Sequence, residues 1–180
     1  MVVHLDDDFY PLLEKALKPY NQYENCKTDQ WDGVNYTSEE HPDRSSKACW
    51  VDDDNVYALV DGLVVFANEK CGWNLDVDYI EPLQLTKYDV GDFYTWHIDE
   101  SNWTPGKREN NRIRKISFTV LLNDDFEGGE FEIHTSEKKV IELKKKDIIL
   151  FHADTPHQVR PITSGVRHSL VGWIQGPAYK

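Results

Sequence analysis

The chain has 180 residues, and 20 lysines and arginines against 32 aspartates and glutamates give it a formal net charge of −12. Hydrophobic residues make up 39% and aromatic residues 12% of the sequence, which excludes a largely disordered chain, because disordered chains are poor in both. The acidic balance disfavours broad binding to nucleic acid or to anionic membranes, since both require clustered lysine and arginine. We therefore expect one folded domain over residues 1–180 with a sizeable core.

The cysteines and the N-terminal segment indicate a cellular compartment. Cys26, Cys49 and Cys71 are odd in number and far apart, so they predict neither a disulfide framework nor a CxxC zinc site. The first residues, MVVHLDDDFY, are acidic where a signal peptide is basic, and no apolar run of about 18 residues occurs. We expect a cytoplasmic protein that does not bind a membrane; the sequence does not predict an oligomeric state.

The first half of the chain predicts two helices and a long connection. Apolar residues recur at helical spacing over Phe9–Tyr20 and again over Asn55–Cys71, where Gly72 is expected to end the helix. The intervening Asn21–Asp54 has no clean period, so we interpret it as a surface loop, with a lid that covers substrate as the alternative. Residues 1–82 would thus be a helical support and loop region.

Strand patterns dominate the second half. Short strands are predicted at Leu83–Asp89, Lys115–Asn123, Glu130–Thr135, Lys139–Leu143, Asp147–Phe151, His157–Pro161 and Val166–Gln175. Asp124-Asp125 and Gly128-Gly129 indicate a hairpin turn between the second and third of these. Helices followed by many short strands favour a mainly β fold, a jelly roll over residues 83–176 with the N-terminal helices packed on one sheet.

One segment, YDVGDFYTWHID, carries a pattern typical of a metal site. His97 and Asp99 are two residues apart, so their side chains point to the same face if the segment is extended. A further histidine from a distant strand would complete a site of two histidines and one carboxylate, which suits Fe(II) because coordination positions stay open. The spacing alone leaves four candidates for that ligand: His134, His152, His157 and His168.

The last predicted strand places a cation on an inward face. Arg167, Ser169, Val171 and Trp173 alternate onto one side of Val166–Gln175, whereas His168 points to the other. A guanidinium inside an apolar barrel requires an anion, and its planar fork matches a carboxylate; Ser169 would add a hydroxyl donor to the same group.

Together these segments resemble the Fe(II)/2-oxoglutarate-dependent dioxygenases, in particular the prolyl 4-hydroxylase-like group that includes the PKHD-type hydroxylases. The resemblance covers Leu83–Gln175 and is carried by YDVGDFYTWHID, by KISFTVLLND with FEGGEF, and by PHQVRPITSGVRHSLVGWIQ. It implies a double-stranded β-helix, that is, a cupin-like jelly roll. It also implies that the iron ligands are His97, Asp99 and His157.

The resemblance further implies how the cosubstrate is held and what the enzyme does. Arg167 would pair with the distal carboxylate of 2-oxoglutarate, and Tyr88 and Ser169 would lie close to it. The implied reaction uses O2 and 2-oxoglutarate to hydroxylate an unactivated C–H bond, releasing succinate and CO2. A prolyl residue in a peptide or protein is the implied substrate, and ascorbate the implied reductant of the iron. Leu121 and Leu122 stand where some prolyl hydroxylases have a second tyrosine, so cosubstrate contacts would differ.

Two further features carry competing interpretations. The insert SNWTPGKRENNRIRK concentrates Lys107, Arg108, Arg112, Arg114 and Lys115 and is either a solvated loop or a mobile lid that steers an anionic or peptide substrate. Trp96 alternates away from the metal pair and is assigned to packing; Trp173 is assigned to the barrel core near the pocket.

Other functions stay open at this level. The same chemistry could demethylate nucleic-acid bases, although the net charge opposes this and Trp173 stands where repair enzymes of this kind have a second arginine. A small-molecule oxygenase, or a jelly-roll module that binds without turnover, is the other alternative.

Overall fold

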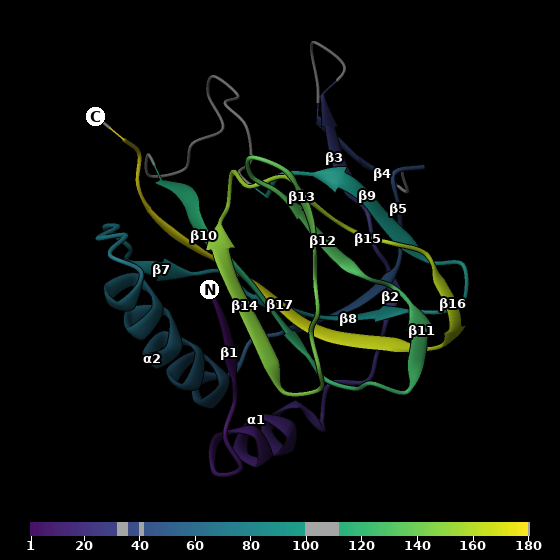
Figure 1. The fold of residues 1–180 in the computed structure, drawn as a ribbon, viewed down its shortest axis with the longest axis horizontal. Coiled ribbons are helices and arrows are strands. Elements are labelled where there is room, and N and C mark those ends of the chain that lie inside the picture. The colour runs from purple at the N-terminus through teal and green to yellow at the C-terminus, as the bar shows by residue number, and fades with distance from the viewer. Residues whose placement is uncertain (32–35, 40–41, 100–111, 180) are drawn as a thin grey trace.

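The computed structural model describes residues 1–31, 36–39, 42–99 and 112–179 (Figure 1). The helices are α1 (Phe9–Leu17) and α2 (Asp54–Lys70). The strands are β1 (Val2–His4), β2 (Glu24–Asn25), β3 (Thr28–Trp31), β4 (Tyr36–Glu39), β5 (Arg44–Ser45), β6 (Lys47–Val51), β7 (Tyr79–Ile80), β8 (Leu83–Tyr88), β9 (Phe93–His97), β10 (Arg112–Leu121), β11 (Phe126–Gly128), β12 (Phe131–His134), β13 (Lys138–Ile141), β14 (Asp147–His152), β15 (His157–Val159), β16 (Ile162–Gly165) and β17 (Arg167–Pro177).

Two antiparallel sheets face each other across the molecule. Within the described residues, the major sheet has the order β1-β14-β10-β17-β8-β6-β2, with β7 added to β17, and the minor sheet has the order β13-β12-β15-β9-β5. Side chains of both sheets meet in one apolar cluster that includes Tyr88 and Phe151 from the major sheet and Phe131 and Val159 from the minor sheet. This arrangement confirms the predicted jelly roll.

Alternation along the major-sheet strands separates two environments. On β8 and β17, Leu83, Leu85, Leu170 and Ile174 join the cluster that packs under the helices, whereas the residues between them face the minor sheet. Successive side chains of a strand point to opposite faces, so one strand can serve a helix-packed core and an interior cavity together.

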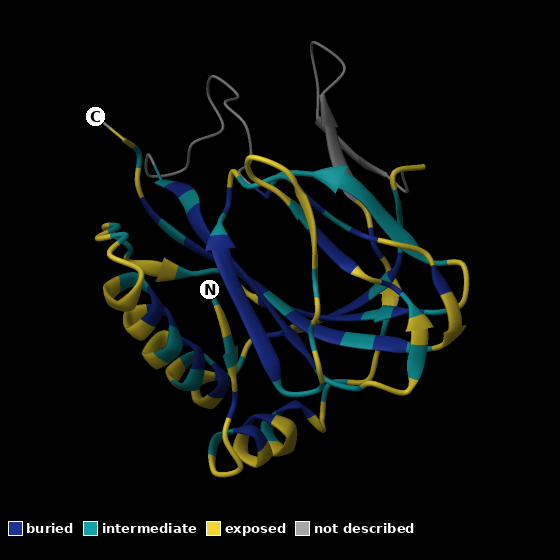
Figure 2. Cartoon of the chain, in the orientation of Figure 1, coloured by how far each residue is buried: buried dark blue, intermediate teal, exposed yellow. Residues whose placement is uncertain are grey.

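Both helices cover the outer face of the major sheet, as predicted. Figure 2 shows their exposed residues on the solvent side and buried residues on the side of the sheet; Leu13, Val56 and Val60 are among the buried ones. The α2 helix begins at an N-cap, Asp53, which accepts hydrogen bonds from two backbone N–H groups of the first turn. No helix in the described residues is long and apolar enough to cross a membrane.

The interpretation of Asn21–Asp54 as a loop is wrong for much of its length. The segment contains β2, β5 and β6, and β6 pairs with β8 in the major sheet. Ala48, Cys49 and Val51 of β6 are buried. The sequence does not reveal these strands, because β2 and β5 have only two residues each and β6 buries the adjacent Ala48 and Cys49 instead of alternating. The lid alternative falls partly on residues 32–35 and 40–41, outside the described part of the chain.

The predicted hairpin between Lys115–Asn123 and Glu130–Thr135 is also wrong. The two corresponding strands, β10 and β12, lie in different sheets, and the segment between them forms β11, which pairs with β16. Gly128 and Gly129 both have positive φ, 72° and 64°. A Cβ at Gly129 would fall on Ile162 Cδ1 and 3.1 Å from Arg167 Cδ, so the glycines allow the chain to cross close to Arg167.

Candidate functional site

A cavity between the two sheets gathers every residue that the sequence predicted for the site. The space free of protein atoms there is about 450 Å³, a value that includes solvent at the open mouth. Its wall includes the six predicted side chains: His97, Asp99, His157, Arg167, Tyr88 and Ser169.

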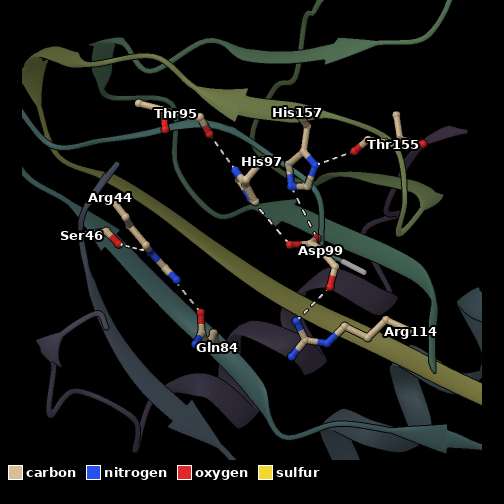
Figure 3. A network of polar contacts seen from close by, with 9 residues as sticks. All are labelled: Arg44, Ser46, Gln84, Thr95, His97, Asp99, Arg114, Thr155 and His157. Atoms are coloured by element: carbon tan, nitrogen blue, oxygen red, sulfur yellow. Dashed lines mark hydrogen bonds and ion pairs between the residues drawn. The ribbon is translucent and has the colours of Figure 1, made fainter. Parts of the chain in front are cut away.

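The two histidines lie opposite each other on neighbouring strands of the minor sheet. His157 of β15 is the register partner of His97 at the end of β9, and their ring centroids are 4.1 Å apart. Asp99 lies in a bend after β9, so the extended segment that the alternation argument assumed ends before it, yet its carboxylate converges on both rings (Figure 3). Its oxygens lie 3.6 Å from His97 Nε2 and 3.4 Å from His157 Nε2.

Each ring is oriented by a backbone carbonyl two residues earlier. His97 Nδ1 lies 2.7 Å from the carbonyl oxygen of Thr95, and His157 Nδ1 lies 2.9 Å from that of Thr155. A carbonyl oxygen only accepts, so each Nδ1 carries the proton and each Nε2 has a free lone pair directed at the centre. Such outer contacts fix the tautomer that a metal ligand requires.

Asp99 is held by its backbone, which leaves its carboxylate free to face the histidines. Its N–H donates to the carbonyl of Ala153 at 2.9 Å. Arg114 Nη1 donates to its carbonyl oxygen at 3.2 Å, and the same guanidinium makes two hydrogen bonds of 2.6 Å to Glu81. The Glu81 carboxylate therefore anchors Arg114, and Arg114 anchors Asp99.

Charge and burial favour the protonation states that bind a divalent cation. Burial, with the neighbouring His157, lowers the pKa of His97 to about 4. Burial acts to raise the pKa of the Asp99 carboxyl, but His157, His97 and further polar neighbours, Arg114 among them, together lower it. A neutral His97 imidazole beside an ionised Asp99 carboxylate follows at neutral pH. Potential ligand atoms of the three side chains all lie within 4.8 Å of one another, so they could hold a metal ion.

Arg167 is a buried cation in the same cavity. Its side chain is 2% exposed, and burial lowers the pKa of the guanidinium. Its Nη1 donates to Ser169 Oγ at 2.9 Å, but no carboxylate among the described residues forms an ion pair with it. A buried guanidinium without an anion is unfavourable in the free protein, so the cavity has the chemistry of a carboxylate site.

Tyr88 and Ser169 line the wall on either side of this guanidinium. Tyr88 is the register partner of Arg167 across β8 and β17, and the Arg167 Cζ lies 5.7 Å from its ring centroid. Ser169 Oγ lies 2.7 Å from the hydroxyl of Thr86. Because Arg167 donates to it, Ser169 extends the polar surface around the guanidinium; its contact with a cosubstrate stays a prediction.

The other candidate histidines lie elsewhere. Exposed His134 packs beside Trp96, His152 packs against Trp73, and His168 lies beside Tyr23 on the opposite face of β17. None of them belongs to the cluster of ligand atoms found in the described residues.

Sequence reasoning missed a second guanidinium in the cavity, Arg44. Its Nε donates to Ser46 Oγ at 2.8 Å and its Nη2 to Gln84 Oε1 at 3.2 Å (Figure 3). Its Cζ lies 4.8 Å from the ring centroid of Tyr94, and that ring stacks on His97 at 3.4 Å. No local signal marks Arg44, because β5 is two residues long and reaches the cavity through its pairing with β9.

The basic insert differs from both interpretations where it is described. Arg112, Arg114 and Lys115 belong to β10, and the two arginines are engaged by Asp78 and Glu81. They are therefore not free charges of a lid. Lys107 and Arg108 lie in residues 100–111, outside the described residues.

Comparison with known proteins assigns this arrangement to a family. A family model described as the 2OG-Fe(II) oxygenase superfamily matches residues 83–175, which is just over half of the chain. The chain belongs to the 2OG-Fe(II) oxygenase superfamily. Membership in this family implies Fe(II) and 2-oxoglutarate, and the His-Asp-His cluster with the unpaired Arg167 fits that pair of groups.

The curated relatives are named PKHD-type hydroxylases, which is the group that the sequence motifs resemble. A PKHD-type hydroxylase of Synechococcus sp. (strain CC9902) is 37% identical over 99 residues, covering 53% of this chain and 42% of that protein. One from Idiomarina loihiensis is 35% identical over 95 residues, covering 51% and 40%. The chain thus spans about two-fifths of the length of these relatives.

Solved structures share the fold of this oxygenase. A prolyl-4-hydroxylase of Pseudomonas putida superposes with a TM-score of 0.68 at 19% identity, covering 99% of this chain and 92% of the other. A prolyl hydroxylase of Trichoplax adhaerens, solved with a hypoxia inducible factor peptide fragment, gives 0.69 at 18% identity, covering 97% and 82%.

Proposed function

We propose that the chain is an Fe(II)- and 2-oxoglutarate-dependent dioxygenase that hydroxylates a prolyl residue in a peptide or protein and releases succinate and CO2. The observation that carries this proposal is the position of the His97, Asp99 and His157 cluster in the same cavity as the unpaired Arg167. A keto-diacid cosubstrate requires both a metal site and a buried cation that binds its far carboxylate, and this cavity contains side chains suited to both.

In this proposal His97 and His157 bind Fe(II) through Nε2, and Asp99 binds it through a carboxylate oxygen. The carbonyls of Thr95 and Thr155 keep the rings from turning, and the backbone anchors of Asp99 hold its carboxylate in place. With three protein ligands, the ion would keep coordination positions free, as an oxygenase requires. Bound Fe(II) and 2-oxoglutarate supply the oxidising power for C–H hydroxylation by O2.

Arg167 would hold the distal carboxylate of 2-oxoglutarate, supported by Ser169 and bordered by Tyr88. Charge supports this role. Fe(II) carries two positive charges and Asp99 one negative charge, so a dianionic cosubstrate with Arg167 brings the centre to neutrality. Phe131 and Phe151 pack on the ring of His157, and Val159 lines the same cavity. These apolar side chains limit the access of water on their side of the reacting groups.

Prolyl peptides are favoured as substrates by three features taken together. The cavity is partly open to solvent, so a larger molecule can approach it from outside. Trp173 lines it with a buried indole N–H that has no hydrogen-bond partner in the described residues, so a donor is available for a substrate carbonyl. The similar folds include a prolyl hydroxylase solved with a peptide.

We also propose that residues 1–180 act as one catalytic domain, with the core at 83–176. The N-terminal part is more than a helical support, because β5 contributes Arg44 to the cavity wall. Ascorbate dependence and a cytoplasmic location stay predictions.

A mass-shift screen tests the proposal. Proline-containing peptides are incubated with the protein, Fe(II), 2-oxoglutarate and O2, and a gain of one oxygen atom on proline is expected in a subset. Asp99→Ala should abolish it, whereas the matched variant His152→Ala, outside the ligand cluster, should retain it. A screen in which no peptide gains oxygen, but methylated single-stranded DNA loses methyl groups, would replace the prolyl substrate with a nucleic acid.

A further inference from the structure

The arginines of this protein fall into two groups. Among those that the structure describes, Arg112, Arg114 and Arg160 each pair with a carboxylate. Arg44 and Arg167 do not form an ion pair with any described carboxylate, and both line the cavity. Arg167 is accounted for by the cosubstrate, whereas Arg44 has no assigned anion.

Arg44 is held in place by neutral groups. Ser46 and Gln84 accept from its Nε and Nη2, and Tyr94 supports the flat face of the guanidinium. These contacts fix its position without neutralising it. Gln84 is decisive here, because a carboxylate in the same place would complete an internal ion pair and a carboxamide cannot.

The stacked rings place Arg44 beside the proposed metal centre. The Tyr94 ring contacts both the guanidinium and His97, and it is nearly parallel to the imidazole, at 13°. Arg44 is therefore one ring away from a proposed iron ligand. Consecutive peptide residues are about 3.8 Å apart, so a group one or two residues from the reacting C–H bond can reach it.

Charge balance points the same way. With Fe(II), Asp99, 2-oxoglutarate and Arg167 summing to neutrality as proposed above, the one positive charge left in the described cavity wall is that of Arg44. A partly buried cation in a low-dielectric cavity is stabilised by one further anion, and a guanidinium prefers a carboxylate.

We propose, resting on the proposed function, that Arg44 binds a carboxylate of the substrate and makes the enzyme selective for acidic peptides. The carboxylate comes either from an aspartate or glutamate next to the reacting proline or from the free end of the peptide chain. Arg44 is thus a specificity residue, and Gln84 keeps its charge available.

Binding of matched peptides under nitrogen tests this assignment. One probe is the tripeptide glutamyl-prolyl-glutamate with acetylated and amidated ends, and its neutral partner is the corresponding glutaminyl peptide. A third probe has the glutaminyl sequence with a free carboxyl end, which separates the two carboxylate sources. Dissociation constants are measured by calorimetry with Fe(II) and 2-oxoglutarate present, so no turnover is required.

The wild type is expected to bind one of the acidic probes roughly 10- to 100-fold more tightly than the neutral probe. Arg44→Ala should bring this ratio close to one. Gln84→Glu should also bring this ratio close to one, because the new carboxylate would form an ion pair with Arg44 within the protein. Gln22→Glu, which adds the same charge at an exposed position, should keep the wild-type ratio.

Gln84→Glu protects the test against a folding defect, since Arg44 bridges β5 and β8 and its removal could unfold the protein. If Arg44 had only a structural role, Gln84→Glu would raise stability without changing the acid-to-neutral ratio, and that result would overturn the proposal. Equal binding of all probes by the wild type, or no binding of either acid at millimolar concentration, would also overturn it. A preserved ratio with no oxygen gained in air would instead contradict the prolyl hydroxylase function and leave the Arg44 assignment standing.

Discussion

His97 and His157 face each other across the β9–β15 ladder, and each ring is turned by a carbonyl two residues before it. Antiparallel pairing brings directly opposite residues within side-chain contact. Strand register therefore brings the two histidines together and presents two Nε2 atoms to Asp99. Thr95 belongs to β9, whereas Thr155 lies in the bend before β15, so the orientation of His157 also depends on that bend.

Removal of one predicted ligand should strongly weaken metal binding. We expect His157→Ala to weaken Mn(II) or Fe(II) binding by at least about 100-fold, because two ligands remain and the cavity offers no replacement in the described wall. The measurement is a calorimetric titration without oxygen. His152→Ala serves as the control and should bind metal like the wild type; equal losses in both variants would contradict the ligand assignment.

Arg167→Met should separate stability from cosubstrate binding. Without a cosubstrate, the buried guanidinium lacks a carboxylate, so its replacement by an apolar side chain is expected to leave the free energy of unfolding unchanged or to raise it by about 1–2 kcal/mol. Affinity for 2-oxoglutarate should fall roughly 100-fold. Denaturant unfolding and calorimetry measure the two effects. A large loss of stability with unchanged affinity would indicate a structural ion pair instead.

Gly129→Ala should displace the side chain of Arg167. The residue has a positive φ, and a Cβ there meets Ile162 and the Arg167 side chain. We expect a loss of about 1–3 kcal/mol in unfolding free energy together with weaker 2-oxoglutarate binding. Gly62→Ala is the matched control: its Cβ meets nothing within 4 Å in α2, so it should stabilise by about 0.5–1 kcal/mol. Equal effects in both would refute the close approach.

The sequence predicted the parts of the site that depend on local pattern. Alternation along Val166–Gln175 placed Arg167 and Ser169 inward and His168 outward, and the chemistry of His97 and Asp99 marked the metal face. The choice of His157 came from the family resemblance, because spacing alone left four histidines. Arg44 was missed because its role depends on a two-residue strand, and the Thr95 and Thr155 contacts because a backbone carbonyl leaves no trace in the sequence.

The metal-free protein should lose stability on mild acidification. The folded His97 has a pKa of about 4 against 6.5 for the free side chain, so between these values the unfolded chain binds a proton that the folded protein does not. The free energy of unfolding therefore falls as the pH drops from 6.5 towards 4, by about 1–3 kcal/mol. His97→Gln should flatten this slope in denaturant unfolding at several pH values. A slope unchanged in the variant would contradict the buried neutral imidazole.

The most direct test of the central assignment is the quantity of succinate formed from 2-oxoglutarate in air. The account predicts formation by the wild type that requires Fe(II), that is lost in His97→Ala and His157→Ala, and that persists in His152→Ala. Wild-type protein that forms no succinate with Fe(II) and the accepted peptide, or triad variants that form as much as the wild type, would contradict the assignment.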